Sequence, residues 1–212
     1  MFIQFLITHY QIILRRLYFS EYFMKILKKI IRKIYSRKVT RWPAPEYDDN
    51  NQPHFFFLVT PPYTGSTLIA KLLNTSNKTM FLQQNGEGQW LVPGLCEEDR
   101  WNPMKKINYE SVKAVWLNKY QNVKKQNPKI EVVIEKSPPN MVRIEELASH
   151  FKTYTFIANN RDPYANCASI LYRQHDADRL SEGERIKILE ILADEWLIRS
   201  RRIREIIQNK NI

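Results

Sequence analysis

The chain alternates short apolar runs with longer stretches of helical periodicity, which predicts strands alternating with helices. Apolar runs of strand length cover residues 54–60, 131–135 and 153–159. Helical spacing covers residues of about 65–74, 109–125, 141–150, 163–172 and 181–208. The glycines and prolines of residues 75–108 predict irregular structure there. Strands that alternate with helices favour an α/β domain with a central parallel sheet.

Residues suited to binding anions follow each of the three predicted strands. The first turn contains Gly65 beside several hydroxyl side chains, the second contains Lys136, and the third contains Arg161, with Ser169 two helical turns beyond it. The carboxyl ends of parallel strands lie at one edge of a sheet, and ligands bind there in such folds. We therefore expect the three turns to converge on one site.

The first turn has the residues of an anion site at a helix start. Gly65 allows close approach of a backbone to a bulky anion, and Ser66 and Thr67 can donate hydrogen bonds from their hydroxyls. A nucleotide-triphosphate loop would also need an earlier glycine and a lysine, which are missing here, so an ordinary kinase or ATPase is disfavoured. The alternative interpretation is a helix N-cap without a ligand.

The other two turns carry cations. Arg161 is placed for bidentate contact to a phosphate, and its alternative is an ion pair with Asp162 or another neighbouring carboxylate. Lys136 could neutralise charge on a leaving group, and its alternative is a solvated lysine at a strand end.

In their order and combination, the three segments resemble the PAPS-dependent sulfotransferase family, especially its Golgi-type and bacterial carbohydrate- and protein-modifying branch. The resemblance covers residues of about 54–173 and rests on Gly65–Leu68, Glu135–Arg143, and Arg161–Pro163 with Ser169. It implies a P-loop NTPase-like three-layer fold of the sulfotransferase type.

The family's chemistry implies roles for the residues that match its motifs. The first turn would hold the 5′-phosphosulfate of 3′-phosphoadenylyl sulfate (PAPS) through Tyr63, Thr64, Gly65, Ser66 and Thr67. Arg161 and Ser169 would hold the 3′-phosphate of PAPS, and no metal would be needed. The reaction would transfer a sulfuryl group to a hydroxyl or amine of an acceptor that the sequence does not identify.

Two catalytic roles need separate assignment. The family usually has a lysine or arginine at the position of Tyr63, so we expect Lys136 to supply the cation instead. Related enzymes use a glutamate shortly after the first helix as general base, which corresponds to Glu87. His175 and Glu97 are the alternative bases, and a solvated Glu87 in a loop is the alternative without function.

Three functions remain in competition. An active sulfotransferase is favoured, and an inactive PAPS-binding pseudoenzyme or fragment is the alternative. The alternative rests on Tyr63 and on the family's further strand and loop, which normally follow the long helix but do not follow it before Ile212. A P-loop nucleotide kinase is less favoured. The segment 75–130, with Trp90, Trp101 and Trp116, is expected to shape the acceptor site.

Charge separates the N-terminal segment from the rest of the chain. The net charge is +11, and residues 1–41 hold ten basic side chains against one acidic one, leaving +2 for the other 171 residues. This distribution disfavours nucleic-acid binding by the domain. Apolar residues at helical spacing within 26–34 favour a helix on an anionic membrane surface. The alternatives are a helix packed on the domain or on a partner, and a degenerate signal anchor of the Golgi type.

The remaining organisation follows from composition. Residues 42–53 are rich in proline and polar side chains and predict a linker into a domain of residues 54–212. Two cysteines, Cys96 and Cys167, give neither a disulfide framework nor metal-ligand spacing.

Overall fold

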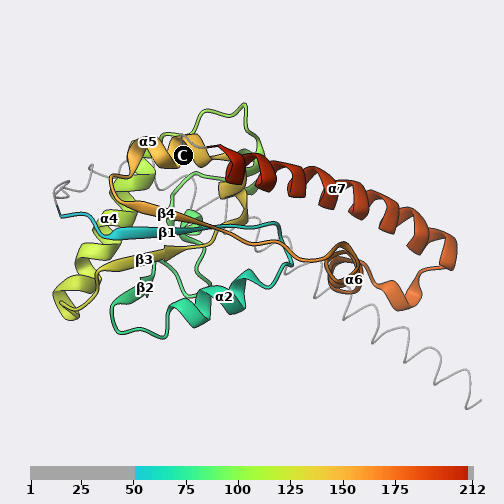
Figure 1. The fold of residues 1–212 in the computed structure, drawn as a ribbon, viewed down its shortest axis with the longest axis horizontal. Helices are drawn as coiled ribbons and strands as arrows, with labels where there is room; N and C mark the ends of the chain where they lie inside the picture. Colours follow the sequence, from blue (N-terminus) through green and yellow to red (C-terminus); the bar gives the residue numbers. More distant parts are fainter. Residues whose placement is uncertain (1–50, 210–212) are drawn as a thin grey trace, which may run out of the picture. The chain divides into compact units, whose positions relative to one another are not determined.

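The computed structural model describes residues 51–209, which contain one sheet of four parallel strands (Figure 1). The order across the sheet is β2-β3-β1-β4, so the first strand along the chain lies between the third and the fourth. The strands are β1 (His54–Val59), β2 (Thr79–Phe81), β3 (Val132–Glu135) and β4 (Tyr154–Ala158). The expected α/β architecture with a parallel sheet is confirmed.

Helices connect and follow these strands, and their ends are set by local hydrogen bonds. The α-helices are α2 (Ser66–Leu73), α3 (Glu97–Trp101), α4 (Tyr109–Gln126), α5 (Ile144–His150), α6 (Pro163–Gln174) and α7 (Glu182–Gln208). Asn108 and Asp162 cap α4 and α6 by accepting backbone N–H groups of the first turn. Ser181 and Glu184 form a reciprocal capping box that starts α7.

The strand β1 packs one set of alternate side chains on each face of the sheet, because successive residues of a strand point in opposite directions. Phe55 and Phe57 join a core cluster with Trp116 of α4 and Leu147 of α5. Leu58 packs on the opposite face in a cluster that includes α2 residues. Figure 1 shows α4 and α5 on one side of the sheet and α2 on the other, an arrangement compatible with a three-layer α/β fold.

Two expected features of the fold were wrong. Residues 75–108 are not irregular throughout, because they contain β2, a 3-10 helix at Gly88–Leu91 and α3. The strand β2 is three residues long and exists through its pairing with β3, which a local sequence pattern does not reveal. The expected helix at 141–150 begins later, at Ile144, after a separate 3-10 helix at Pro138–Val142 that starts with two prolines.

The N-terminal expectations concern residues outside the described part of the chain. The basic segment 1–41 and residues 42–50 of the expected linker lie outside the described residues. Within residues 51–209, no helix is both long enough and apolar enough to cross a membrane.

Candidate active site

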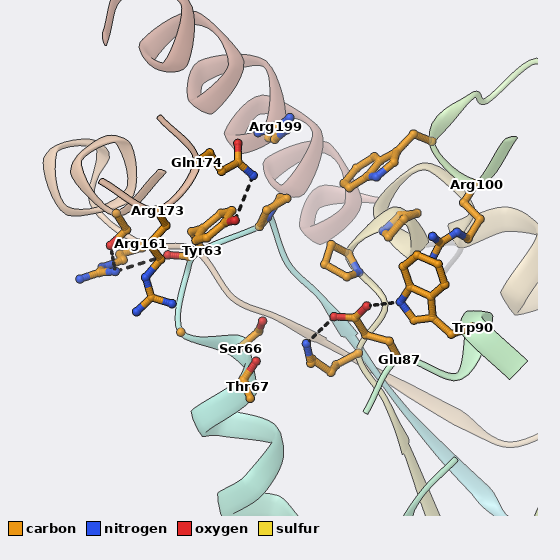
Figure 2. Close-up of a pocket in the computed structure, with 17 residues that line it drawn as sticks. Tyr63, Ser66, Thr67, Glu87, Trp90, Arg100, Arg161, Arg173, Gln174 and Arg199 are labelled. Carbon is orange, nitrogen blue, oxygen red and sulfur yellow. Dashed lines mark hydrogen bonds and ion pairs between the residues drawn. The ribbon is translucent and has the colours of Figure 1, made fainter. Parts of the chain in front are cut away.

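A cavity of about 660 Å³ lies where the three turns after β1, β3 and β4 meet (Figure 2). Its lining combines residues of these turns with residues of α6, α7 and the segment between β2 and α4. The polar and aromatic lining residues are Tyr63, Ser66, Thr67, Glu87, Trp90, Arg100, Trp101, Lys136, Arg161, Ser169, Arg173, Gln174 and Arg199. The expected convergence of the three turns is therefore confirmed.

The turn after β1 is held by its own hydroxyl groups. The Thr64 hydroxyl donates to the Pro61 carbonyl at 2.9 Å and lies 2.5 Å from the Thr60 hydroxyl. Asn159 donates to the Thr64 hydroxyl at 3.0 Å from the neighbouring strand end. The Thr64 side chain is therefore used inside the turn, and it does not line the cavity with Ser66 and Thr67.

Two residues of this turn have left-handed backbone conformations. Tyr63 has φ of 62° and Gly65 has φ of 87°. A Cβ atom on Gly65 would meet no other atom within 4 Å, so the space in front of this residue is open and the φ angle is what favours glycine. The backbone N–H groups of Ser66 and Thr67, the first two residues of α2, have no acceptor within the helix, whereas the Leu68 N–H donates to the Gly65 carbonyl at 2.9 Å. A turn of this kind suits a phosphate or sulfate group.

The side chain of Tyr63 is directed toward α6. Its hydroxyl accepts a hydrogen bond from the Gln174 amide at 2.9 Å, and its ring packs on a cluster that contains Cys167 and Leu171. Figure 2 shows the phenol next to Gln174 and turned away from Ser66 and Thr67. The first turn thus contributes backbone and hydroxyl donors, and any cation at this end of the cavity comes from another segment.

Lys136 and Glu87 form an ion pair at the same end of the cavity. The Lys136 Nζ atom lies 2.8 Å from Glu87 Oε1, and the Trp90 indole N–H donates to Glu87 Oε2 at 2.6 Å. The exposed fractions of the two side chains are 6% for Lys136 and 20% for Glu87. The two solvated alternatives for these residues are therefore wrong. We call the start of α2 together with Lys136 and Glu87 the reactive end.

Arg161 lies on the other side of Tyr63. Its Nη1 atom donates to the Ser169 hydroxyl at 2.9 Å and to the Tyr63 carbonyl at 3.3 Å. Asp162 does not pair with Arg161, because its carboxylate caps α6 through the Ala165 N–H at 2.9 Å. Within the described part of the chain, Arg161 forms no ion pair and is exposed. We call Arg161, Ser169 and the neighbouring Arg173 the anchoring end.

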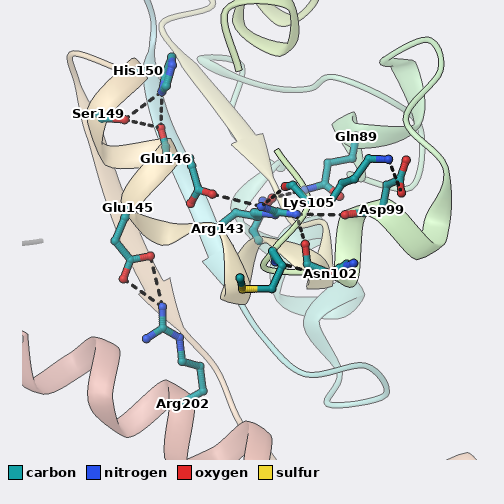
Figure 3. Close-up of polar contacts among 12 residues, drawn as sticks. Gln89, Asp99, Asn102, Lys105, Arg143, Glu145, Glu146, Ser149, His150 and Arg202 are labelled. Carbon is teal, nitrogen blue, oxygen red and sulfur yellow. Dashed lines mark hydrogen bonds and ion pairs between the residues drawn. The ribbon is translucent and has the colours of Figure 1, made fainter. Parts of the chain in front are cut away.

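The segment Glu135–Arg143 divides between the cavity and the interior. Lys136 lines the cavity, whereas Glu135, Asn140 and Arg143 are buried. Figure 3 shows Arg143 surrounded by Asp99, Asn102 and Lys105. Its guanidinium donates to the backbone carbonyls of all three residues and to the carboxylate of Glu146. Arg143 therefore fixes the segment between α3 and α4, which adjoins the cavity.

Several cavity residues were not predicted from the sequence. Arg173 and Gln174 end α6, and Arg199 comes from α7. Arg173 lies four residues after Ser169 and so on the same face of α6, which is the one signal that could have identified it. Arg199 forms an ion pair with Glu195 at 2.8 Å, within its own helix.

Of the three tryptophans expected at the acceptor site, two line the cavity and one does not. Trp90 and Trp101 line the cavity, and the Arg100 guanidinium lies 3.7 Å from the centre of the Trp90 ring. Trp116 is fully buried in the core, where its indole N–H donates to the Gly88 carbonyl at 2.9 Å. Trp116 thus supports the loop around Glu87 from the core side and does not line the cavity.

Of the two alternative bases, only His175 can be placed relative to the site. His175 ends α6 and is absent from the cavity lining, and the side chain of Glu97 lies outside the described part of the structure. In residues 51–209, no group of three or more His, Cys, Asp or Glu side chains is arranged to hold a metal ion.

Comparisons with protein-family models, with curated proteins and with solved structures found no match to this chain. The functional assignment consequently rests on the sequence motifs and on the geometry of this cavity.

Proposed function

We propose that the protein is a sulfotransferase that moves a sulfuryl group from PAPS to a hydroxyl or amine of an acceptor. The observation that carries this proposal is a single cavity that joins a helix N-terminus, a lysine–carboxylate pair and a separate arginine–serine pair. A donor with anionic groups at both ends matches two anion-binding positions on one sheet edge better than a ligand with one anionic group does.

The donor would lie across the carboxyl ends of the strands. The open space before Gly65 and the backbone N–H groups of Ser66 and Thr67 suit the 5′-phosphosulfate, with the hydroxyls of the same two residues as further donors. Arg161 already donates to Ser169, so both groups converge where a 3′-phosphate could replace their mutual hydrogen bond. Arg173 would add a second positive charge beside Arg161.

The chemical step needs a base and a cation close together. The acceptor oxygen or nitrogen would attack sulfur while the bond from sulfur to the bridging phosphate oxygen breaks, and the Glu87 carboxylate would take the acceptor proton. The negative charge that develops on the departing phosphate would be stabilised by Lys136 and by the α2 N–H groups. The products are 3′-phosphoadenosine 5′-phosphate (PAP) and the sulfated acceptor. Positioning and charge stabilisation supply the rate enhancement without a metal.

A donor-binding protein without transferase activity is the second candidate. Tyr63 turns toward Gln174, and Lys136 is engaged with Glu87, so within the described residues the Ser66 and Thr67 side of the first turn gains a cation from the Lys136 segment only if Lys136 changes partners. In this case, the anchoring end would bind the donor, but the reactive end would not support sulfuryl transfer.

Calorimetric titration with PAP tests both candidates. We expect the wild type to bind PAP and Arg161→Ala to bind it at least tenfold more weakly. Arg179→Ala is the matched control, because Arg179 is 84% exposed, pairs with Asp176 and does not line the cavity. Absence of PAP binding by the wild type would eliminate both candidates. Binding without consumption of radiolabelled PAPS, with water or an acceptor panel, would select the inactive form.

A further inference from the structure

Glu135 is a fully buried carboxylate, and its hydrogen-bond partners within residues 51–209 include no cation. It ends β3, immediately before Lys136. Its Oε1 atom accepts from the Gly88 N–H at 2.8 Å and from the Ser137 hydroxyl, and its Oε2 atom accepts from the Ser137 N–H at 3.1 Å and from the Asn140 amide. Burial raises the pKa of Glu135 to about 7, although these hydrogen bonds oppose the shift. A carboxylate in such a position is costly, so it calls for a specific role.

The contacts of Glu135 belong to a set that joins two segments. One segment is the loop 86–89, which carries Glu87, and the other is the turn 135–140, which carries Lys136. The Lys136 N–H donates to the Gly86 carbonyl at 2.8 Å, and the Gln89 amide donates to Asn140 Oδ1 at 2.5 Å. Glu87 therefore lies between Gly86 and Gly88, each of which is tied to the Lys136 segment.

The loop 86–89 also packs closely against the Lys136 side chain. Gly86 has φ of 81°, and a Cβ atom there would lie 2.9 Å from Lys136 Cγ. Behind the loop, Trp116 donates to the Gly88 carbonyl, so Gly88 is held through its N–H by Glu135 and through its carbonyl by Trp116. A small displacement of this loop would therefore displace Glu87 as well.

We propose that Glu135 is a positioning residue that holds the Glu87 carboxylate opposite Lys136 by fixing the loop 86–89 on the turn 135–140. The catalytic meaning of this role rests on the proposed sulfotransferase function. The positioning itself does not, because it concerns the Glu87–Lys136 geometry in the protein without ligand.

The donor pattern explains why a carboxylate is needed at this position. Four donors converge on Glu135, namely two backbone N–H groups, a hydroxyl and an amide. An ionised carboxylate offers acceptor sites on both oxygens, whereas a glutamine would direct an NH₂ group at two of these donors. Glu135→Gln conserves shape and burial but breaks the hydrogen-bond pattern on one side.

Indole N–H signals in ¹H–¹⁵N correlation spectra provide the test, because three tryptophans report on separate places. Trp90 donates to Glu87, Trp116 donates to the Gly88 carbonyl, and Trp196 donates to the Arg161 carbonyl at 2.8 Å in the anchoring end. In Glu135→Gln we expect the Trp90 signal to move toward its position in Glu87→Ala, and the Trp116 signal to move as well. The Trp196 signal should stay in place.

A swap variant separates hydrogen bonding from packing. In Glu135→Gln combined with Asn140→Asp, the introduced glutamine amide can donate to the introduced carboxylate, which can still accept from Gln89, so only the Ser137 N–H keeps an unsuitable partner. We expect this variant to return the Trp90 signal toward its wild-type position. The matched control is Glu131→Gln, which removes an exposed carboxylate four residues earlier and should move none of the three signals.

Each outcome decides the proposal. A folded Glu135→Gln variant with unmoved Trp90 and Trp116 signals would overturn it, as would a folded swap variant in which Trp90 stays displaced. If Glu135→Gln does not fold, Ser137→Ala removes one donor to Oε1 together with the long contact that the Ser137 hydroxyl accepts from the Gln89 N–H at 3.4 Å, and it should give a smaller displacement of the same two signals. An unmoved Trp90 signal in that variant would equally count against the proposal.

Ligand binding and turnover separate this inference from the proposed function. In Glu135→Gln we expect transfer from PAPS to water to fall at least tenfold in kcat, with the dissociation constant of PAP within about twofold of wild type. A wild type that fails to bind PAP while Glu135→Gln displaces Trp90 would remove the sulfotransferase assignment and leave the positioning role intact. PAP binding with an unmoved Trp90 signal would do the reverse.

Discussion

Lys136 and Glu87 at the reactive end are mostly buried and are tied into a network that includes Glu135, Gly88 and Trp116. Arg161 at the anchoring end is exposed, and in the described part of the chain its side chain contacts a hydroxyl and a carbonyl but no carboxylate. The difference suggests separate tasks. A reacting group must be held accurately before the substrate arrives, whereas a group that captures a phosphate must stay reachable from solvent. Four predictions test this division, from the largest expected effect to the smallest.

Replacement of Lys136 should have the largest effect, because it removes the cation nearest the proposed leaving group. We expect Lys136→Met to lower PAPS turnover by about 100- to 1,000-fold, the range found for loss of a single transition-state donor. PAP binding should weaken by no more than about tenfold, because the anchoring end is intact. Initial rates with radiolabelled PAPS and calorimetry with PAP would measure the two effects. Lys78→Met is the control, since Lys78 pairs with Glu131 on the surface. Turnover within about threefold of wild type would contradict the role of Lys136.

The buried Glu135, which adjoins the reactive end, should make stability depend on pH. The pKa of Glu135 is about 7 in the folded protein against an ordinary value of 4.5, so the folded state binds the extra proton between these values. Stabilisation from the protonated group is complete below about pH 4.5 and is lost as the pH rises through about 7. Relative to Glu135→Gln, the wild type should lose about 3 kcal/mol of unfolding free energy between about pH 4 and pH 8.

Urea denaturation of both proteins at several pH values would measure this difference, since other titrating groups cancel in the comparison. Arg161→Ala should follow the wild-type curve in shape, because the anchoring end contains no buried acid in its described contacts. A constant difference between wild type and Glu135→Gln across the pH range would show that Glu135 does not titrate in this window.

Replacement of Arg161 should act on ligand binding and depend on the 3′-phosphate. We expect Arg161→Ala to weaken PAP by about 10- to 100-fold, as for loss of a charged hydrogen bond. Adenosine 5′-phosphate, which lacks the 3′-phosphate, should bind the wild type and Arg161→Ala almost equally. Calorimetry with both ligands would measure the effect. Equal weakening of the two ligands would assign Arg161 to another part of the donor.

The two ends also differ in how far the sequence predicted them. Arg161 and Ser169 are eight residues apart in one segment, and the resemblance to the sulfotransferase motif was enough to assign them to one group of the donor. Lys136 and Glu87 are 49 residues apart, and their pairing depends on the path of a loop that starts after β2. The strand β2 itself has only three residues and was missed, because its pairing with β3 is a tertiary effect.

The sequence also mispredicted which side chains line the cavity, because this too depends on tertiary packing. Trp116 was expected at the acceptor site from its aromatic character, but its position on α4 places it against Phe55 and Phe57 in the core. Arg173 and Gln174 show the reverse case. Their sequence pattern is typical of a solvated helix face, but both residues line the cavity. Their place in the cavity follows from how α6 packs on the first turn through Tyr63, a contact between residues more than one hundred positions apart.

Replacement of Arg173 should have the smallest effect and shows whether the anchoring end has one cation or two. Arg173 is exposed and forms no ion pair within residues 51–209, so its removal should leave the fold unchanged. We expect Arg173→Gln to weaken PAP by about three- to tenfold, the range of a solvent-screened charge contact of about 1 kcal/mol. Adenosine 5′-phosphate should be unaffected, as should PAP binding by the control Arg179→Gln.

Combination with Arg161→Ala sharpens this last prediction. If both guanidinium groups contact the same phosphate, the double variant should lose less affinity than the sum of the two single losses, because the second removal acts on a phosphate already released from the site. Strict additivity would place Arg173 on a different group of the donor. An effect on adenosine 5′-phosphate would move it to the reactive end, where it would take the place of the cation that Tyr63 does not provide. In that case, the reactive end would include an exposed residue of α6, and burial would no longer distinguish it from the anchoring end.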